Sequence, residues 1–172
     1  MSSTCVLACG FFLFRTAQFN WECSKQPIAN GTDTACNTLK SSVSDRTCVP
    51  HYTVVGYMGG HGEYPNYGNY TANNNTFSET VRIEFDETKT SYESILETYW
   101  LFAPDPTEPP LDVAYQLRLF YTNENQKQLA EESIVRQTKL HLNQTLYVEV
   151  LNASDWVFWK AEENQQQLVQ HT

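Results

Sequence analysis

The segment LACGFFLFRTAQF, residues 7–19, places a cysteine beside a change of backbone type. Residues 4–9 are apolar enough for a buried strand that ends at Gly10, and residues 11–19 space their apolar side chains like a helix packed on a sheet. A strand-to-helix turn is a suitable place for a reactive group, so Cys9 is a candidate nucleophile. The same residues also fit two other interpretations, the apolar segment of a signal peptide and ordinary core.

The signal-peptide interpretation depends on residues 5–14, CVLACGFFLF, which have the length of such a segment. These residues lack a basic flank, and Arg15 stands near the expected cleavage site, where a small residue is required. No apolar run in the sequence reaches the roughly 18 residues of a membrane-spanning helix. We therefore expect no membrane span.

Three of the five cysteines lie in a polar stretch rich in Ser, Thr and Asn: Cys23, Cys36 and Cys48. Their setting predicts a structural disulfide that staples a long loop, with a relocated redox pair as the alternative. There is no CxxC pair and the four histidines are scattered, so we expect neither a metal site nor a cofactor.

Five Asn-X-Ser/Thr sequons are present, at Asn30, Asn69, Asn74, Asn143 and Asn152. Together with the cysteines they favour a secreted, N-glycosylated protein, with a cytoplasmic location as the alternative. The competing interpretation of the sequons is a surface that is rich in Asn and Thr but carries no glycan.

The net charge of the chain indicates which kinds of partner it can bind. The chain has 11 basic and 20 acidic residues, a net charge of -9 and a pI near 4.8. A nucleic-acid partner is excluded on this basis, because phosphate binding requires clustered Lys and Arg. Anionic membrane surfaces are disfavoured for the same reason.

Hydrophobic periodicity predicts one α+β domain over residues 1–172, interrupted by a loop insertion at 20–50. Val81, Ile83 and Phe85 alternate with polar residues and predict a strand with one buried face. The expected strands cover 4–9, 51–60, 78–87, 114–122 and 145–152, and the expected helices cover 11–19, 91–102, 123–143 and 156–170.

A series of motifs then resembles one known family. VGYMGG, YPNY, SETVRIEFD, SYESILETYW, DPT, YQLRLFYTNENQKQLAEES and FWKAEENQQQ follow the order and spacing of the A-type peptide methionine sulfoxide reductases. The resemblance covers nearly the whole chain outside residues 20–50. It implies a two-layer α/β sandwich in which helices flank a mixed sheet.

The resemblance also implies a chemistry. In that family a thiolate at a strand-to-helix turn attacks the sulfoxide sulfur while a carboxylic acid protonates the departing oxygen. Glu79 matches the acid, Tyr67 one of two oxygen-binding tyrosines, and Asp112 an aspartate that helps to hold the oxygen. The second tyrosine position is occupied by Leu117, which has no hydroxyl.

The nucleophile motif departs from the family pattern. Residues 10–13, GFFL, align with the family's Gly-Cys-Phe-Trp, so Phe11 stands in the nucleophile position. Phe12 and Leu13 then fall on the positions that line the substrate site. A slip of two residues would instead place Cys9 on the nucleophile, but it would move the thiol into the strand and away from the helix N-terminus that lowers its pKa.

These residues predict a catalytically degenerate reductase-like domain that serves as a secreted binding or structural module, with a protein partner or an extracellular assembly. The alternative is an active reductase that uses Cys9 as nucleophile and Glu79 as acid. A third possibility is a different activity of Tyr67, Glu79 and Asp112 that needs no thiol.

Overall fold

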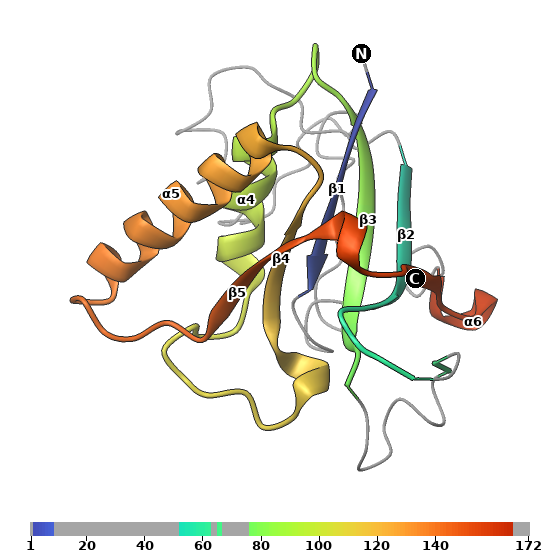
Figure 1. The fold of residues 1–172 in the computed structure, drawn as a ribbon. Coiled ribbons are helices and arrows are strands. Elements are labelled where there is room, and N and C mark those ends of the chain that lie inside the picture. The colour runs from blue at the N-terminus through green and yellow to red at the C-terminus, as the bar shows by residue number, and fades with distance from the viewer. Residues whose placement is uncertain (1, 9–51, 63–64, 67–75, 167–172) are drawn as a thin grey trace, which may run out of the picture.

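The computed structural model describes residues 2–8, 52–62, 65–66 and 76–166 of the chain. Its strands form one six-stranded mixed sheet in the order β5-β4-β1-β3-β2-β6 (Figure 1). All neighbouring strands are antiparallel except the parallel pair β4 and β5. The strands are β1 (Ser2–Ala8), β2 (Tyr52–Met58), β3 (Ser78–Asp86), β4 (Leu117–Tyr121), β5 (Val148–Asn152) and β6 (Trp159–Lys160).

Two long helices cover one face of this sheet, α4 (Tyr92–Phe102) and α5 (Glu124–Leu140). Local side chains set where both begin: the Ser91 hydroxyl accepts from the amide of Ser94, and the Asn123 side chain accepts from that of Gln126. Such caps satisfy amides that have no partner inside the helix. Within the described ranges no helix has the length and apolar character that crossing a membrane requires.

The core between helices and sheet follows the alternation of β3. Ile83 and Phe85 are buried there with Val81 packed beside them, as the period-two pattern predicted. They meet apolar residues of α4 and α5, and together these make up the largest apolar cluster in the described residues. The predicted α+β fold with a mixed sheet and flanking helices is therefore confirmed.

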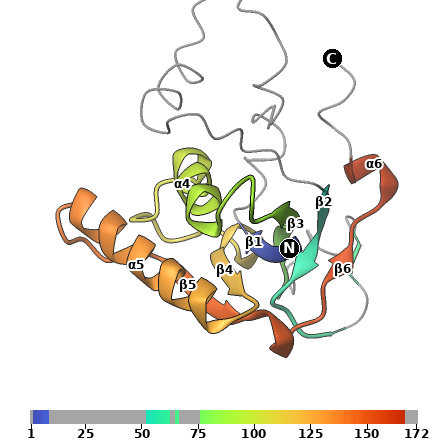
Figure 2. The same ribbon diagram turned by 90° about the horizontal axis from the view of Figure 1, so that it is seen from above.

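The opposite face of the sheet is covered by the chain between β5 and β6, which includes the 3-10 turn η2 (Ala153–Asp155). Figure 2 shows this segment crossing on the side away from α4. Ala153, Trp156 and Phe158 pack there against buried side chains of β1, β2 and β4. The sheet is thus shielded on both faces near the end of β1.

The predicted closing helix over 156–170 is wrong for its first part. Trp159 and Lys160 form a strand that pairs with Tyr57 and Gly56 of β2, and only α6 (Glu163–Gln166) is helical. The glycine explains the contact, because a Cβ at Gly56 would lie 2.3 Å from the Trp159 carbonyl oxygen. Residues 167–170 lie outside the described residues, as do the predicted helix 11–19 and the 20–50 insertion.

Candidate functional site

Glu79 lies near the start of β3, at the end of the sheet where β1 finishes. Its register partner is Tyr57 on β2, and the adjacent Thr80 pairs with Ala8, the last residue of β1. The side chain of Glu79 is only 5% exposed. Because side chains alternate along a strand, Glu79 shares the helix-facing side of the sheet with Val81 and Ile83. A carboxyl group is therefore buried on the helix-facing side of the sheet, beside the end of β1.

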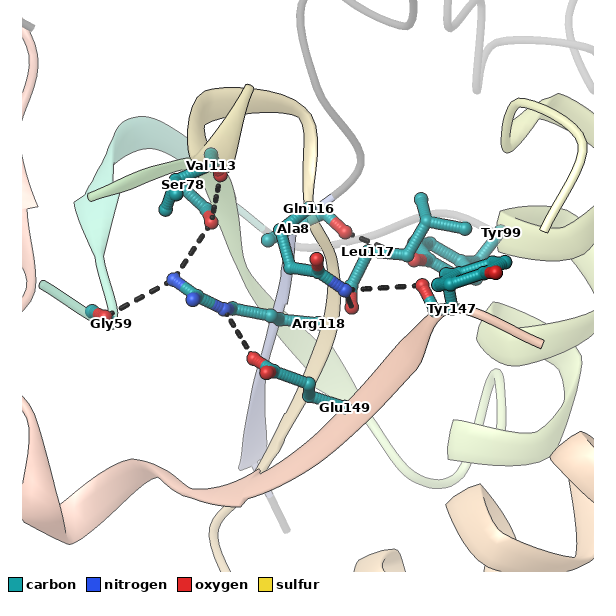
Figure 3. Close-up of polar contacts among 10 residues, drawn as sticks. All are labelled: Ala8, Gly59, Ser78, Tyr99, Val113, Gln116, Leu117, Arg118, Tyr147 and Glu149. Atoms are coloured by element: carbon teal, nitrogen blue, oxygen red, sulfur yellow. Dashed lines mark hydrogen bonds and ion pairs between the residues drawn. The ribbon is translucent and has the colours of Figure 1, made fainter. Parts of the chain in front are cut away.

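Asp112 is placed beside this strand end by a 3-10 turn, η1 (Val113–Tyr115). Its carboxylate accepts from the amide of Ala114 at 3.0 Å, which fixes the start of the turn. Ser78, the neighbour of Glu79, donates its hydroxyl to the Val113 carbonyl at 2.9 Å (Figure 3). The structure thus brings the segments of Glu79 and Asp112 together, with Asp112 exposed to solvent.

Leu117 begins β4 and is 3% exposed in the apolar cluster under the helices. The resemblance placed a second oxygen-binding tyrosine at this position. The side chain that the structure shows there is apolar and supplies no hydrogen-bond donor. Leu117 therefore contributes to the packing between the sheet and the helices.

Two buried tyrosines that the sequence analysis did not select lie beside the candidate site. The hydroxyl of Tyr57 donates to the Glu162 carboxylate at 3.2 Å, and that of Tyr99 donates to the Ala8 carbonyl at 2.9 Å. The first bond ties the C-terminal segment to β2, and the second ties α4 to the end of β1. Tyr57 belongs to the VGYMGG motif and Tyr99 to SYESILETYW, and these motifs were the signal in the sequence for the two residues.

Cys5 is the one cysteine in the part of the chain that the structure describes. It lies fully buried in β1, opposite Ile83. Burial raises the pKa of its thiol well above the usual range because the thiolate would be poorly solvated. Cys5 is therefore a core residue and not a nucleophile.

Several predicted residues lie outside the described ranges: Cys9, Phe11, Phe12, Leu13, Tyr67, Cys23, Cys36, Cys48, Asn30, Asn69 and Asn74. Asn143 and Asn152 are described. Asn143 is exposed after α5 with a φ of 61°, whereas the Asn152 side chain accepts bonds from the amide and hydroxyl of Ser154. Among residues 2–8, 52–62, 65–66 and 76–166, no three His, Cys, Asp or Glu side chains are grouped as metal ligands.

The fold and site together define an α+β domain of the methionine sulfoxide reductase kind. The sequence model of the family described as "Peptide methionine sulfoxide reductase" matches residues 40–172. The chain therefore belongs to the A-type peptide methionine sulfoxide reductase family. The match begins after residues 10–13, where the nucleophile motif is expected.

Individual relatives agree with this assignment. The chain is 33% identical to a peptide methionine sulfoxide reductase of Solanum lycopersicum over 123 residues, which are 69% of this chain and 61% of that protein. It is 32% identical to a probable peptide methionine sulfoxide reductase of Schizosaccharomyces pombe over 120 residues, 66% of this chain and 69% of that protein. It spans only 44% of a chloroplastic relative from Oryza sativa.

Two solved structures share the fold. Reduced Mxr1 from Saccharomyces cerevisiae superposes with a TM-score of 0.64 at 17% identity, covering 96% of this chain and 82% of that one. Methionine sulfoxide reductase A of Corynebacterium diphtheriae gives 0.61 at 18% identity, with 96% and 73% coverage. At this identity the likeness establishes the fold.

Proposed function

We propose that this domain recognises methionine sulfoxide side chains but lacks the thiol nucleophile with which its family reduces them. The observation that carries the proposal is the buried Glu79 beside the end of β1. Burial of a carboxyl carries a desolvation cost, and a carboxyl is buried here at the position that matches the family's acid. A protonated carboxyl there would donate a hydrogen bond to a sulfoxide oxygen.

The loss of reduction follows from Phe11 and Leu117. Phenylalanine has no lone pair to attack sulfur, so Phe11 in the aligned nucleophile position ends the usual reaction at its first step. The buried Leu117 supplies no hydroxyl for the oxygen. What remains is a carboxyl, the Asp112 turn and, by the alignment, Tyr67. These groups suit binding of a polar sulfoxide better than its chemical conversion.

We further propose that the protein is secreted and that it acts within an extracellular assembly. The support is the five sequons and the polar, cysteine-containing stretch with Cys23, Cys36 and Cys48. Expression through a secretory pathway, followed by peptide mapping with and without glycosidase, tests this directly. We expect a glycan on the exposed Asn143, and a secreted protein without glycans or disulfides would contradict the proposal.

The test of recognition is calorimetric titration with N-acetyl-methionine-(S)-sulfoxide amide, using the corresponding methionine thioether as the matched ligand. We expect binding of the sulfoxide and at least tenfold weaker binding of the thioether. Equal affinity for both compounds, or affinity for neither, would overturn the proposal. Phe11→Cys returns a thiol to the aligned position, and we expect it to gain turnover with dithiothreitol.

A second candidate function is an active reductase that uses Cys9, and one observation favours it. Cys9 directly follows Ala8, whose partner Thr80 adjoins Glu79 and whose carbonyl is held by Tyr99. In this scheme the Cys9 thiolate attacks the sulfoxide sulfur and Glu79 protonates the oxygen. Oxygen transfer leaves a thioether and a cysteine sulfenic acid, which dithiothreitol reduces. Turnover that disappears in Cys9→Ser would establish this function.

A further inference from the structure

Arg118 carries a largely buried guanidinium at the end of the sheet that holds the candidate site. Its side chain is 11% exposed and donates to three acceptors that are distant in sequence (Figure 3). These are the Gly59 carbonyl at 3.1 Å, the Ser78 hydroxyl at 2.9 Å and the Glu149 carboxylate at 2.7 Å. Glu149 compensates the positive charge, so the remaining donors are available to organise the backbone.

Each acceptor belongs to a different segment around the site. Gly59 follows β2 and begins the connection that contains Tyr67 in the sequence. Ser78 precedes Glu79 and passes the interaction on through its own bond to the Val113 carbonyl, next to Asp112. Arg118 itself follows Leu117 and pairs with Ala8 across β1 and β4. One guanidinium therefore links the residue after β2, the start of β3 and β5, and through Ser78 the turn that follows Asp112.

We propose that Arg118 is the positioning residue of this site, which fixes the Asp112 turn and the chain after β2 relative to Glu79. It acts from the opposite face of the sheet, because Leu117 and Leu119 on either side of it face the helices. It does not touch the ligand. The connection to ligand binding rests on the proposed function, whereas the connection to the two segments does not.

Gly59, in the VGYMGG motif, supports this role independently. Gly59 has a φ of +80°, and a Cβ there would lie 2.8 Å from Nη1 of Arg118. Only glycine adopts this conformation without strain and also lets the guanidinium approach. A glycine in this motif is thus required for the close contact between Gly59 and the Arg118 guanidinium.

The first part of the test is amide hydrogen exchange of the full chain, in wild type and in Arg118→Met. We expect at least tenfold faster exchange at Ala114 in η1, at Gln116, which caps the end of η1, and at His61 after β2. Exchange at Ile83 in β3 should be unchanged. Ser78→Ala removes only the hydroxyl relay, so it should affect Ala114 and Gln116 alone. If Arg118→Met does not fold, the exchange rates of Ser78→Ala test the proposed link from Arg118 to η1. Unchanged exchange at these amides would overturn the proposal.

The second part measures affinity for N-acetyl-methionine-(S)-sulfoxide amide. We expect at least a tenfold loss in Arg118→Met and an intermediate value in Arg118→Lys, which keeps the charge but not the planar fork. Arg136→Met, an exposed ion-pair residue of α5, is the charge control, and Ile134→Ala is the control for lost stability. An affinity loss in Ile134→Ala equal to that in Arg118→Met would overturn the positioning role. If wild type binds no probe, the proposed function fails and the exchange data still decide the role of Arg118.

Discussion

Tyr57 and Glu79 face each other as register partners on β2 and β3, and both side chains are almost excluded from solvent, at 2% and 5% exposure. Directly opposed residues of an antiparallel pair bring their Cβ atoms to about 5 Å. The Tyr57 hydroxyl is committed to the Glu162 carboxylate. The sheet end therefore buries a phenol and a carboxyl as neighbours, which is an unusual use of core volume for a purely structural domain.

Glu79→Gln tests whether this carboxyl serves a ligand. We expect at least a tenfold loss of sulfoxide affinity, because the amide N–H is a weaker hydrogen-bond donor than the carboxylic acid O–H. The free energy of unfolding should change by less than about 1 kcal/mol, because the amide has nearly the same size and shape as the carboxyl. Calorimetric titration and urea denaturation measure the two quantities. Glu84→Gln, on the same strand but half-exposed, is the control. Wild-type affinity in Glu79→Gln would contradict the assignment.

Tyr57→Phe tests the attachment of the C-terminal segment. Loss of a hydroxyl that donates to a carboxylate should lower the free energy of unfolding by about 1–2 kcal/mol. Residues 159–166 should then be cleaved faster in limited proteolysis, because this hydroxyl adds to the β2–β6 pairing, the Ala161 amide and the Gln166 side chain in joining the segment to β2. Tyr52→Phe, exposed on the same strand, should change neither quantity. Unchanged proteolysis of Tyr57→Phe would show that the hydroxyl does not hold the segment.

Tyr99→Phe tests the bond that holds the end of β1. The Ala8 carbonyl and the Tyr99 hydroxyl are both buried, so the loss of this bond should cost about 1–2 kcal/mol. We expect faster amide exchange at Ala8 and Leu7, with exchange in α5 unchanged. Tyr147→Phe removes a more exposed hydroxyl and is the control. A variant as stable as wild type would mean that Tyr99 only packs.

Cys5 predicts a pH dependence of stability. Its pKa is raised by burial, so above about pH 8.5 the unfolded chain loses a proton that the folded chain keeps. The stabilisation is complete below that pH and is lost as the pH rises, by about 1.4 kcal/mol per pH unit. Urea denaturation between pH 7.5 and 10, under identical redox conditions, should show a shallower decline in Cys5→Ala than in wild type. Parallel curves would contradict the burial of this thiol.

The parts of the fold that local patterns determine were predictable from the sequence. The alternation of Val81, Ile83 and Phe85 identified β3, and Ser91 marked the start of α4. The helix predicted from residue 156 was wrong at its start, where the apolar residues WVFW suited a helix that continues into EENQQQ. EENQQQ does contain the helix α6, but pairing of Trp159 with Tyr57, more than a hundred residues earlier in the chain, makes residues 159–160 a strand.

The candidate site residues were selected only through the resemblance. Glu79 and Asp112 carry no local pattern that distinguishes them from surface acids, and only the family motifs selected them. Arg118 escaped notice because its three acceptors lie 59, 40 and 31 residues away. Such contacts depend on strand order, which periodicity does not encode.

The central claim is that the reductase chemistry has been lost, and turnover tests it most directly. The purified wild-type protein is incubated with N-acetyl-methionine-(S)-sulfoxide amide and dithiothreitol, and the thioether product is quantified against a protein-free reaction, with Cys9→Ser alongside. We predict that wild type and Cys9→Ser form no more product than the protein-free reaction. Product formation by wild type that disappears in Cys9→Ser would contradict the account and make Cys9 the nucleophile.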